Sequence, residues 1–245
     1  MSAWLTLVLG LLLIGSAQAG EVRVAAASDL RPAMEAMAAE YRERHPDVLL
    51  RISYGSSGKF ATQIRHGAPF DVYFSADERY PQQLAADGLG GEPQRYGRGR
   101  LVVWIRGEGA APRLQDLLAP GIRRIAIANP EHAPYGQRAI EALGASGVIE
   151  ALRPKLVLAE NAGQSAHFIA SGAVEAGVIA KSLVLDGRLP GGRHALIDEA
   201  LHSPLWQAVM LTRRGASNPG AERLLDFVLG ERGRAHLAAS GFALP

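Results

Sequence analysis

The chain has 245 residues, with 26 Lys and Arg against 24 Asp and Glu, and it contains no cysteine. A formal net charge of +2, with the arginines scattered rather than clustered among aromatic residues, disfavours nucleic acid as a partner. The absence of cysteine excludes disulfides, so the fold has to rely on a sizeable apolar core.

The first residues predict export. Leu5–Ile14 is an apolar run that is too short to span a bilayer as a helix, and Ala17-Gln18-Ala19 is a small-x-small cleavage pattern. We therefore expect residues 1–19 to be a signal peptide, with a periplasmic mature chain that begins at Gly20. A retained membrane anchor is the less favoured alternative. Met1–Trp4 carries no Lys or Arg, which leaves the true start codon open.

Strand-like and helix-like segments alternate along the mature chain. The predicted strands are Val22–Ala27, Val48–Ser53, Asp71–Ser75, Leu101–Ile105, Ile122–Ala128, Val157–Ala159, Gly177–Ala180 and Gln207–Thr212. The predicted helices are Pro32–Arg44, Phe60–His66, Ala76–Leu84, Gln137–Leu143, Ser165–Ser171, Ala221–Leu229 and Glu231–Ala239. This alternation predicts an α/β fold with mainly parallel sheets flanked by helices. The strands are numerous for one sheet, which favours two lobes.

Two soft segments are candidates for the points where the chain crosses between lobes. Gly88–Gly99 is rich in glycine, and Leu201–Pro204 lies before the last predicted strand. We predict that residues 20–100 form the first part of lobe I, residues 101–204 form lobe II, and residues 205–245 return to lobe I. A ligand would then bind between the lobes, at the carboxyl ends of the strands.

Turns made of small and hydroxyl-bearing residues follow several of the predicted strands. They are Ala27-Ser28-Asp29, Gly55–Gly58, Ala133–Gly136 and Asn161–Gln164. The first amides of a helix have no intrahelical partner and lie at the positive end of the dipole, so they attract anions. One such turn alone is more often a helix cap. Several in one chain indicate a site for a small oxyanion.

Catalytic motifs are absent from the sequence. The seven His residues have no zinc-site spacing, and no G-x-S-x-G, Walker A or G-x-G-x-x-G motif is present. Ser56 and Ser57 have no identifiable base. An exported α/β hydrolase that uses Ser57 as its nucleophile remains the alternative of a different class, and it requires a base within about 3 Å of the Ser57 hydroxyl.

The motifs as a set resemble the periplasmic molybdate-binding proteins of ABC importers. The resemblance rests on Ala25–Ser28, Gly55–Gly58, Gly67–Val72, Phe74–Asp77, Asn129–Gly136, Glu160-Asn161 and the closing Gly241-Phe242. It implies a type II periplasmic binding fold that captures molybdate, and tungstate as well, and delivers it to an inner-membrane permease with its ATPase. It also implies a monomer that is not an enzyme and needs no cofactor.

The resemblance further implies which residues contact the anion. Ser28 and Ser57 would each give a hydroxyl and an N–H, whereas Asp29, Tyr135 and Ala162 would each give a backbone N–H, with no direct metal ligand. Asp29 stands where some relatives have Asn, and Ala180 stands where some members place a ligand-bonding Tyr. Another tetrahedral oxyanion, such as sulfate or phosphate, stays open as the ligand, because sequence does not reveal the pocket volume.

Overall fold

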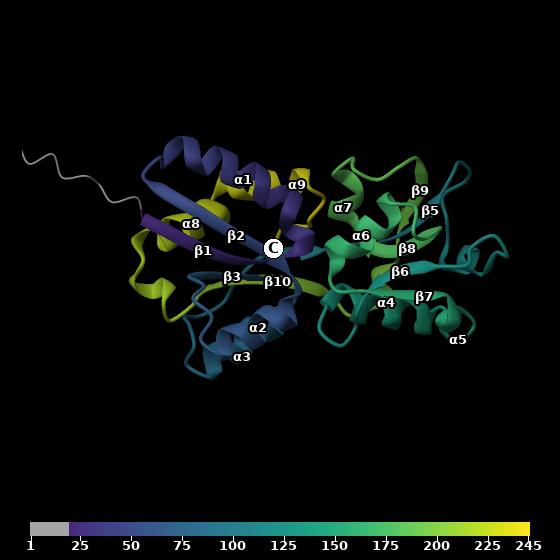
Figure 1. Cartoon of the computed structure of the whole chain (residues 1–245), viewed down its shortest axis with the longest axis horizontal. Helices are drawn as coiled ribbons and strands as arrows, with labels where there is room; N and C mark the ends of the chain where they lie inside the picture. The colour runs from purple at the N-terminus through teal and green to yellow at the C-terminus, as the bar shows by residue number, and fades with distance from the viewer. Residues whose placement is uncertain (1–19) are drawn as a thin grey trace, which may run out of the picture.

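The computed structural model describes residues 20–245, so the predicted signal peptide, residues 1–19, lies outside the described residues. Two five-stranded sheets, each with helices packed against it, lie next to each other along the long axis of the molecule (Figure 1). Within residues 20–245, no helix has the length and apolar character needed to cross a membrane.

The first sheet and its helices are called lobe I below. Its strand order is β2-β1-β3-β10-β4, with the strands β1 (Gly20–Ala27), β2 (Val48–Gly55), β3 (Val72–Ser75), β4 (Gln94–Gly99) and β10 (Leu205–Leu211). Its helices are η1 (Ser28–Leu30), α1 (Arg31–Arg44), α2 (Ser57–Arg65), α3 (Arg79–Ala86), η5 (Gly215–Ser217), α8 (Pro219–Leu229) and α9 (Glu231–Ala239). Apolar residues of α1, α8 and α9 form one core cluster with the sheet, and those of α2 and α3 form another.

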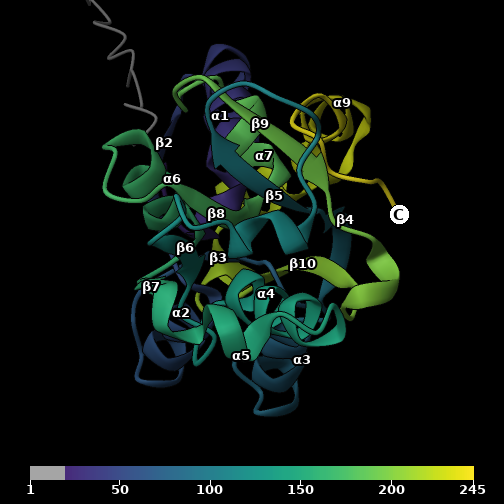
Figure 2. The ribbon, with the colours of Figure 1, turned by 90° about the vertical axis from the view of Figure 1, so that its right-hand side faces the viewer.

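The second sheet and its helices are called lobe II. Its strand order is β7-β6-β8-β5-β9, with the strands β5 (Leu101–Arg106), β6 (Ile125–Ala128), β7 (Leu156–Ala159), β8 (Ala176–Ala180) and β9 (Gly192–Leu196). Its helices are η2 (Leu114–Leu118), α4 (Pro134–Ala145), α5 (Ile149–Leu152), η3 (Arg153–Lys155), α6 (Ala162–Ala170) and α7 (Lys181–Leu185). Figure 2 shows α4 and α5 on one side of this sheet and α7 on the other.

The predicted α/β fold class is confirmed, and both sheets are mixed rather than mainly parallel. In lobe I, β1 runs parallel to β2 and β3, whereas β10 is antiparallel to β3 and β4. In lobe II, β6 runs parallel to β7 and β8, whereas β5 is antiparallel to β8 and β9. In each sheet the antiparallel strand is the one that enters from the other lobe. It reaches the sheet without the helical crossover that would make it parallel to its neighbours.

The two segments that connect the lobes lie against each other. The chain leaves the first sheet after β4 and enters the second with β5, so only Arg100 separates the two strands. It returns through residues 197–204, which include η4 (Glu199–Leu201). Glu199 pairs with Arg98 at 3.3 Å and with Arg100 at 2.7 Å. These ion pairs hold the outgoing and returning segments together at the junction of the lobes.

Candidate functional site

The five residues predicted to form the site lie around one small cavity between the lobes. Its volume is about 10 Å³, which is the space of about one water-sized group. Lobe I contributes Ser28, Asp29 and Ser57, and lobe II contributes Tyr135 and Ala162. All five are buried. The other lining residues are Ala27, Gly55, Ser56, Ala76, Ala133 and Pro134.

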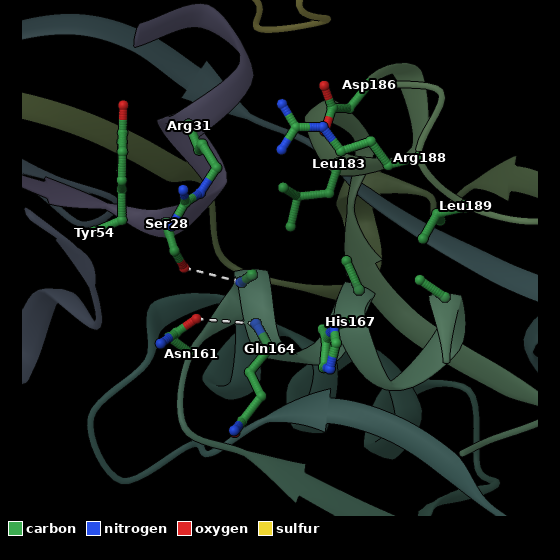
Figure 3. A pocket seen from close by; sticks show the side chains of 13 residues that line it. Ser28, Arg31, Tyr54, Asn161, Gln164, His167, Leu183, Asp186, Arg188 and Leu189 are labelled. Atoms are coloured by element: carbon green, nitrogen blue, oxygen red, sulfur yellow. Dashed lines mark hydrogen bonds and ion pairs between the residues drawn. The ribbon is translucent and has the colours of Figure 1, made fainter. Parts of the chain in front are cut away.

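The two serine hydroxyls of the site are held by backbone amides. Ser57 Oγ accepts a hydrogen bond from the N–H of Ala76 at 3.0 Å. Ser28 Oγ accepts one from the N–H of Gly163 at 2.9 Å, and this bond joins the two lobes (Figure 3). A hydroxyl whose oxygen accepts from an amide still has its own hydrogen to donate. Both hydroxyls are therefore oriented as donors by the chain that surrounds them.

Three helices begin at the cavity. They are α2, α4 and α6, whose first turns contain Ser57, Tyr135 and Ala162. Within residues 20–245, the N–H groups of these three residues make no hydrogen bond. Sequence explains the geometry: Pro134 starts α4 without needing an amide partner, and the Asn161 side chain caps α6 by accepting from Gln164 N–H at 3.0 Å. Three positive dipole ends and three free donors favour an anion here.

Among the residues that the structure describes, Asp29 is the only charged one that lines the cavity. Its Oδ2 accepts a hydrogen bond from Gln207 Nε2 at 2.6 Å, whereas its Oδ1 has no partner among the described residues. Burial raises the pKa of Asp29 to about 6. The hydroxyl of Tyr135 lies next to this carboxyl, and burial together with the charge of Asp29 raises the pKa of Tyr135. A raised pKa favours the neutral carboxyl and so reduces its repulsion of an anion.

Ser57 is not arranged as a nucleophile. The nearby imidazole of His132 contacts Ser56 and not Ser57: its Nδ1 lies 3.0 Å from Ser56 Oγ. Ser56 Oγ donates to the backbone carbonyl of His132 at 2.5 Å, and Gly58 N–H donates to the same carbonyl at 3.0 Å. These bonds fasten lobe I to lobe II instead of activating a serine. Within residues 20–245, no three His, Cys, Asp or Glu side chains are grouped so that they could hold a metal ion.

Sequence reasoning missed three residues that support the site. Ala76, in the turn after β3, and Gly163, in the first turn of α6, hold the serine hydroxyls through their amides. Gln207 holds Asp29 from β10, and its signal is a polar side chain within an otherwise apolar strand. Ala180 is buried at the end of β8, does not line the cavity and supplies no hydroxyl to it.

A second, larger cavity of about 430 Å³ shares Ser28 with the small one, and Figure 3 shows its lining residues. It is lined by Ser28, Arg31, Tyr54, Asn161, Gly163, Gln164, Ala166, His167, Ala170, Leu183, Asp186, Arg188 and Leu189. Arg31 lies over the ring of Tyr54 at 4.1 Å, and Arg188 pairs with Glu35 at 2.7 Å. Ser28 lines both cavities, and Gly163, whose N–H donates to Ser28 Oγ, lines the larger one.

The chain forms two α/β lobes that are joined by two connecting segments and enclose a small buried cavity. This architecture is typical of a binding protein for a small solute. The comparison of the sequence with known families agrees with this class. Residues 22–243 match the family described as bacterial extracellular solute-binding protein, and the chain belongs to this family. It is accordingly a binding protein and not an enzyme.

Individual proteins and solved structures are also similar to this chain. The molybdate-binding protein ModA of Azotobacter vinelandii is 34% identical over 237 residues, which is 95% of this chain and 94% of the relative. The ModA protein of Rhodobacter capsulatus is 34% identical over 226 residues, which is 91% of this chain and 88% of the relative. The solved structure of the Azotobacter vinelandii periplasmic molybdate-binding protein matches with a TM-score of 0.85 and 31% identity over 91% of this chain and 99% of that one. The sulfate-binding protein SubI of Mycobacterium tuberculosis, at 13% identity and a TM-score of 0.73, shares the fold.

Proposed function

We propose that the protein captures molybdate between its lobes and delivers it to an inner-membrane ABC permease and its ATPase. The observation that carries this proposal is the convergence of two serine hydroxyls and three helix-start amides on one buried cavity. Among residues 20–245, these amides have no hydrogen-bond partner and no Lys, Arg or His lines the cavity. The identity to two molybdate-binding proteins over most of both chains supports the same ligand. Tungstate, with the same charge and shape, is proposed as a second ligand.

Uncharged hydrogen-bond donors suit the binding of such an anion. A tetrahedral dianion presents four oxygens, and the cavity offers donors on opposite sides: the hydroxyls and amides of Ser28 and Ser57 from lobe I, and the amides of Tyr135 and Ala162 from lobe II. The amide of Asp29 is proposed as a further donor. Each hydrogen bond to a charged group contributes about 1.5–3 kcal/mol. Because the donors come from both lobes, only the closed arrangement provides all of them, and the ligand stabilises closure by this difference.

Calorimetry with molybdate, tungstate, sulfate and phosphate, measured in parallel, tests the proposal. We expect molybdate and tungstate to bind tightly and sulfate and phosphate to bind weakly, because shorter bonds leave donors on one side of the cavity unsatisfied. Small-angle scattering should show a smaller radius of gyration with molybdate and little change with sulfate. If sulfate binds as tightly and compacts the protein equally, the molybdate assignment is wrong and a broader oxyanion-binding role replaces it.

We also propose that the chain reaches the periplasm after cleavage between Ala19 and Gly20. The motivating features are the apolar run Leu5–Ile14 and the small residues Ala17 and Ala19. Mass spectrometry of the protein isolated from a periplasmic extract should give the mass of residues 20–245. Recovery of the intact chain in the membrane fraction would support a retained anchor instead.

A further inference from the structure

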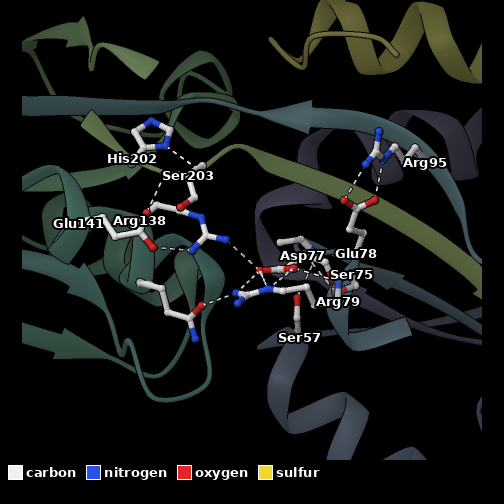
Figure 4. A network of polar contacts seen from close by, with 12 residues as sticks. Ser57, Ser75, Asp77, Glu78, Arg79, Arg95, Arg138, Glu141, His202 and Ser203 are labelled. Atoms are coloured by element: carbon white, nitrogen blue, oxygen red, sulfur yellow. Dashed lines mark hydrogen bonds and ion pairs between the residues drawn. The ribbon is translucent and has the colours of Figure 1, made fainter. Parts of the chain in front are cut away.

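A buried ion pair joins the two lobes beside the small cavity. Arg138, on α4 of lobe II, lies 3.2 Å from Asp77, in the turn after β3 of lobe I, and the two side chains are 7% and 5% exposed (Figure 4). Asp77 also pairs with Arg79 at 2.6 Å, and Arg138 pairs with Glu141 at 2.7 Å. Two cations and two carboxylates therefore form a balanced group at the lobe interface.

The pair connects directly to both sides of the cavity. Asp77 follows Ala76, whose N–H holds Ser57 Oγ at 3.0 Å. The turn itself is fixed by Ser75 Oγ, which donates to the carbonyl of Asp77 at 2.7 Å. On the other side, Arg138 lies one helical turn after Tyr135 on α4. The ion pair thus joins the turn that holds the Ser57 hydroxyl to the helix that presents the Tyr135 amide.

The same group also reaches the segment that returns from lobe II to lobe I. Glu141 Oε2 accepts a hydrogen bond from the N–H of Ser203 at 2.7 Å. Helix α4 is therefore held both against lobe I and against this segment. Removal of one partner from a buried ion pair leaves an uncompensated charge, which strongly disfavours the buried arrangement. An opening of the lobes at this interface would separate Arg138 from Asp77 and admit water to both.

We propose that Arg138 and Asp77 are positioning residues that set the separation between Ser57 and Tyr135, and hence the size of the anion that the closed cavity accepts. This inference rests on the proposed function, since it assigns a selectivity for molybdate to that site. With the separation fixed, an anion of matching size contacts donors on both sides. A smaller anion leaves buried donors unpaired, which is costly. Without the pair, the lobes can settle at other separations, and the penalty on a smaller anion falls.

The test is a double-mutant cycle with Asp77→Asn, Arg138→Gln and the double variant. Glu78→Gln is the matched control, because Glu78 pairs with Arg95 at 2.6 Å within lobe I alone. Calorimetry with molybdate and with sulfate gives the affinity and the selectivity ratio, and thermal melting gives the stability. We expect each single variant to weaken molybdate binding about tenfold or more and sulfate binding less, so that the ratio falls. The double variant should lose less than the product of the single effects.

A merely structural role predicts a different pattern. Variants that melt at lower temperature but keep both affinities and their ratio would overturn the positioning role. The control should match the wild type in affinity and ratio, and an equal loss in Glu78→Gln would also overturn it. Failure of the proposed function has its own signature, because it is seen in the wild type as absent or weaker binding of molybdate relative to sulfate.

A measurement without ligand tests the positioning role of Asp77 and Arg138 even if the proposed function fails. The chain contains no cysteine, so Gln63→Cys on α2 and Gln115→Cys on η2, both exposed and in different lobes, can carry spin labels. We expect Asp77→Asn and Arg138→Gln to broaden the interlobe distance distribution relative to the wild type and Glu78→Gln. Identical distributions in all four proteins would show that the pair does not set the separation.

Discussion

The two cavities that share Ser28 differ in both size and lining. The small cavity of about 10 Å³ is surrounded by hydroxyls and backbone amides, and Asp29 is the only charged residue that lines it within residues 20–245. The larger one, of about 430 Å³, is lined by Arg31, Arg188, Asp186 and His167 together with uncharged polar and apolar residues. Charged side chains therefore lie beside the larger space, and neutral donors surround the smaller.

This difference indicates how an anion can be held without a counter-charge. A buried Lys or Arg would have to lose its hydration in the ligand-free protein, whereas an amide at a helix start already carries partial positive charge without that cost. The arginines of the larger cavity are partly neutralised, since Glu35 lies 3.5 Å from Arg31 and 2.7 Å from Arg188. We therefore expect the free energy of molybdate binding to come from the small cavity rather than from the larger one.

Substitution of the serine hydroxyls should have the largest effect. We expect Ser28→Ala and Ser57→Ala each to weaken molybdate binding by about ten- to a hundredfold, because each loses a hydrogen bond of about 1.5–3 kcal/mol to a charged ligand. Calorimetry measures the change. Ser171→Ala is the matched control, since Ser171 is exposed at the end of α6 and bonds the carbonyl of Phe168. Unchanged affinity in both cavity variants would exclude the small cavity as the binding site.

Removal of a single backbone donor should have a smaller effect. Ala162→Pro deletes one N–H at the first position of α6, where proline is well tolerated. The preceding Asn161 has φ −157° and ψ 175°, an extended conformation that suits a residue before proline. We expect molybdate binding to weaken about tenfold. Ala162→Gly keeps the amide and should bind like the wild type, whereas equal affinity of the proline variant would show that this amide does not contact the anion.

Local sequence patterns were sufficient to locate the turns of the small cavity. Ser28, Ser57 and Ala162 each follow an apolar strand and precede a helix, and parallel strands bring such turns to one edge of their sheet. The segments β4 and β9 were not predicted as strands, because Gln94–Gly99 and Gly192–Leu196 contain glycine, arginine or histidine instead of an apolar run. Sheet direction also escaped prediction, since β10 and β5 are antiparallel only because they enter from the other lobe.

The supporting contacts could not be predicted for a different reason. Gln207 reaches Asp29 across 178 positions of the sequence, and Arg138 reaches Asp77 across 61. A polar residue on a strand or helix gives no local sign of its partner, because such pairs are set by the packing of one lobe against the other. Single-sequence patterns therefore identify donors at helix starts but not the groups that position them.

The acidic residue of the small cavity should make binding depend on pH. In the closed form burial raises the pKa of Asp29 from 3.8 to about 6, so closure takes up a proton if water lowers this pKa in the open form. Closure is then favoured below pH 6 and weakened as the pH rises through 6. We expect the molybdate affinity to fall roughly three- to fourfold between about pH 5.5 and 8.

Asp29→Asn supplies the control for this pH dependence. The variant keeps the backbone N–H and cannot ionise, so its affinity should stay constant over the same range. The neighbouring tyrosines, Tyr96 and Tyr135, have pKa values raised well above their ordinary value and do not titrate there. A wild type with the same flat profile as Asp29→Asn would show that the carboxyl does not take part in closure.

The smallest effect should come from salt and from the charges of the larger cavity. Bulk ions screen exposed charges over about 8–10 Å but act weakly on contacts inside a buried cavity. We therefore expect the molybdate affinity to change less than about twofold between roughly 20 and 300 mM NaCl, and Arg31→Gln and Arg188→Gln to bind like the wild type. If the affinity instead falls steeply with salt, and this fall disappears in either arginine variant, the anion binds in the larger cavity. The two cavities would then exchange roles, because the partly exposed guanidinium groups, and not the buried amides, would bind the ligand.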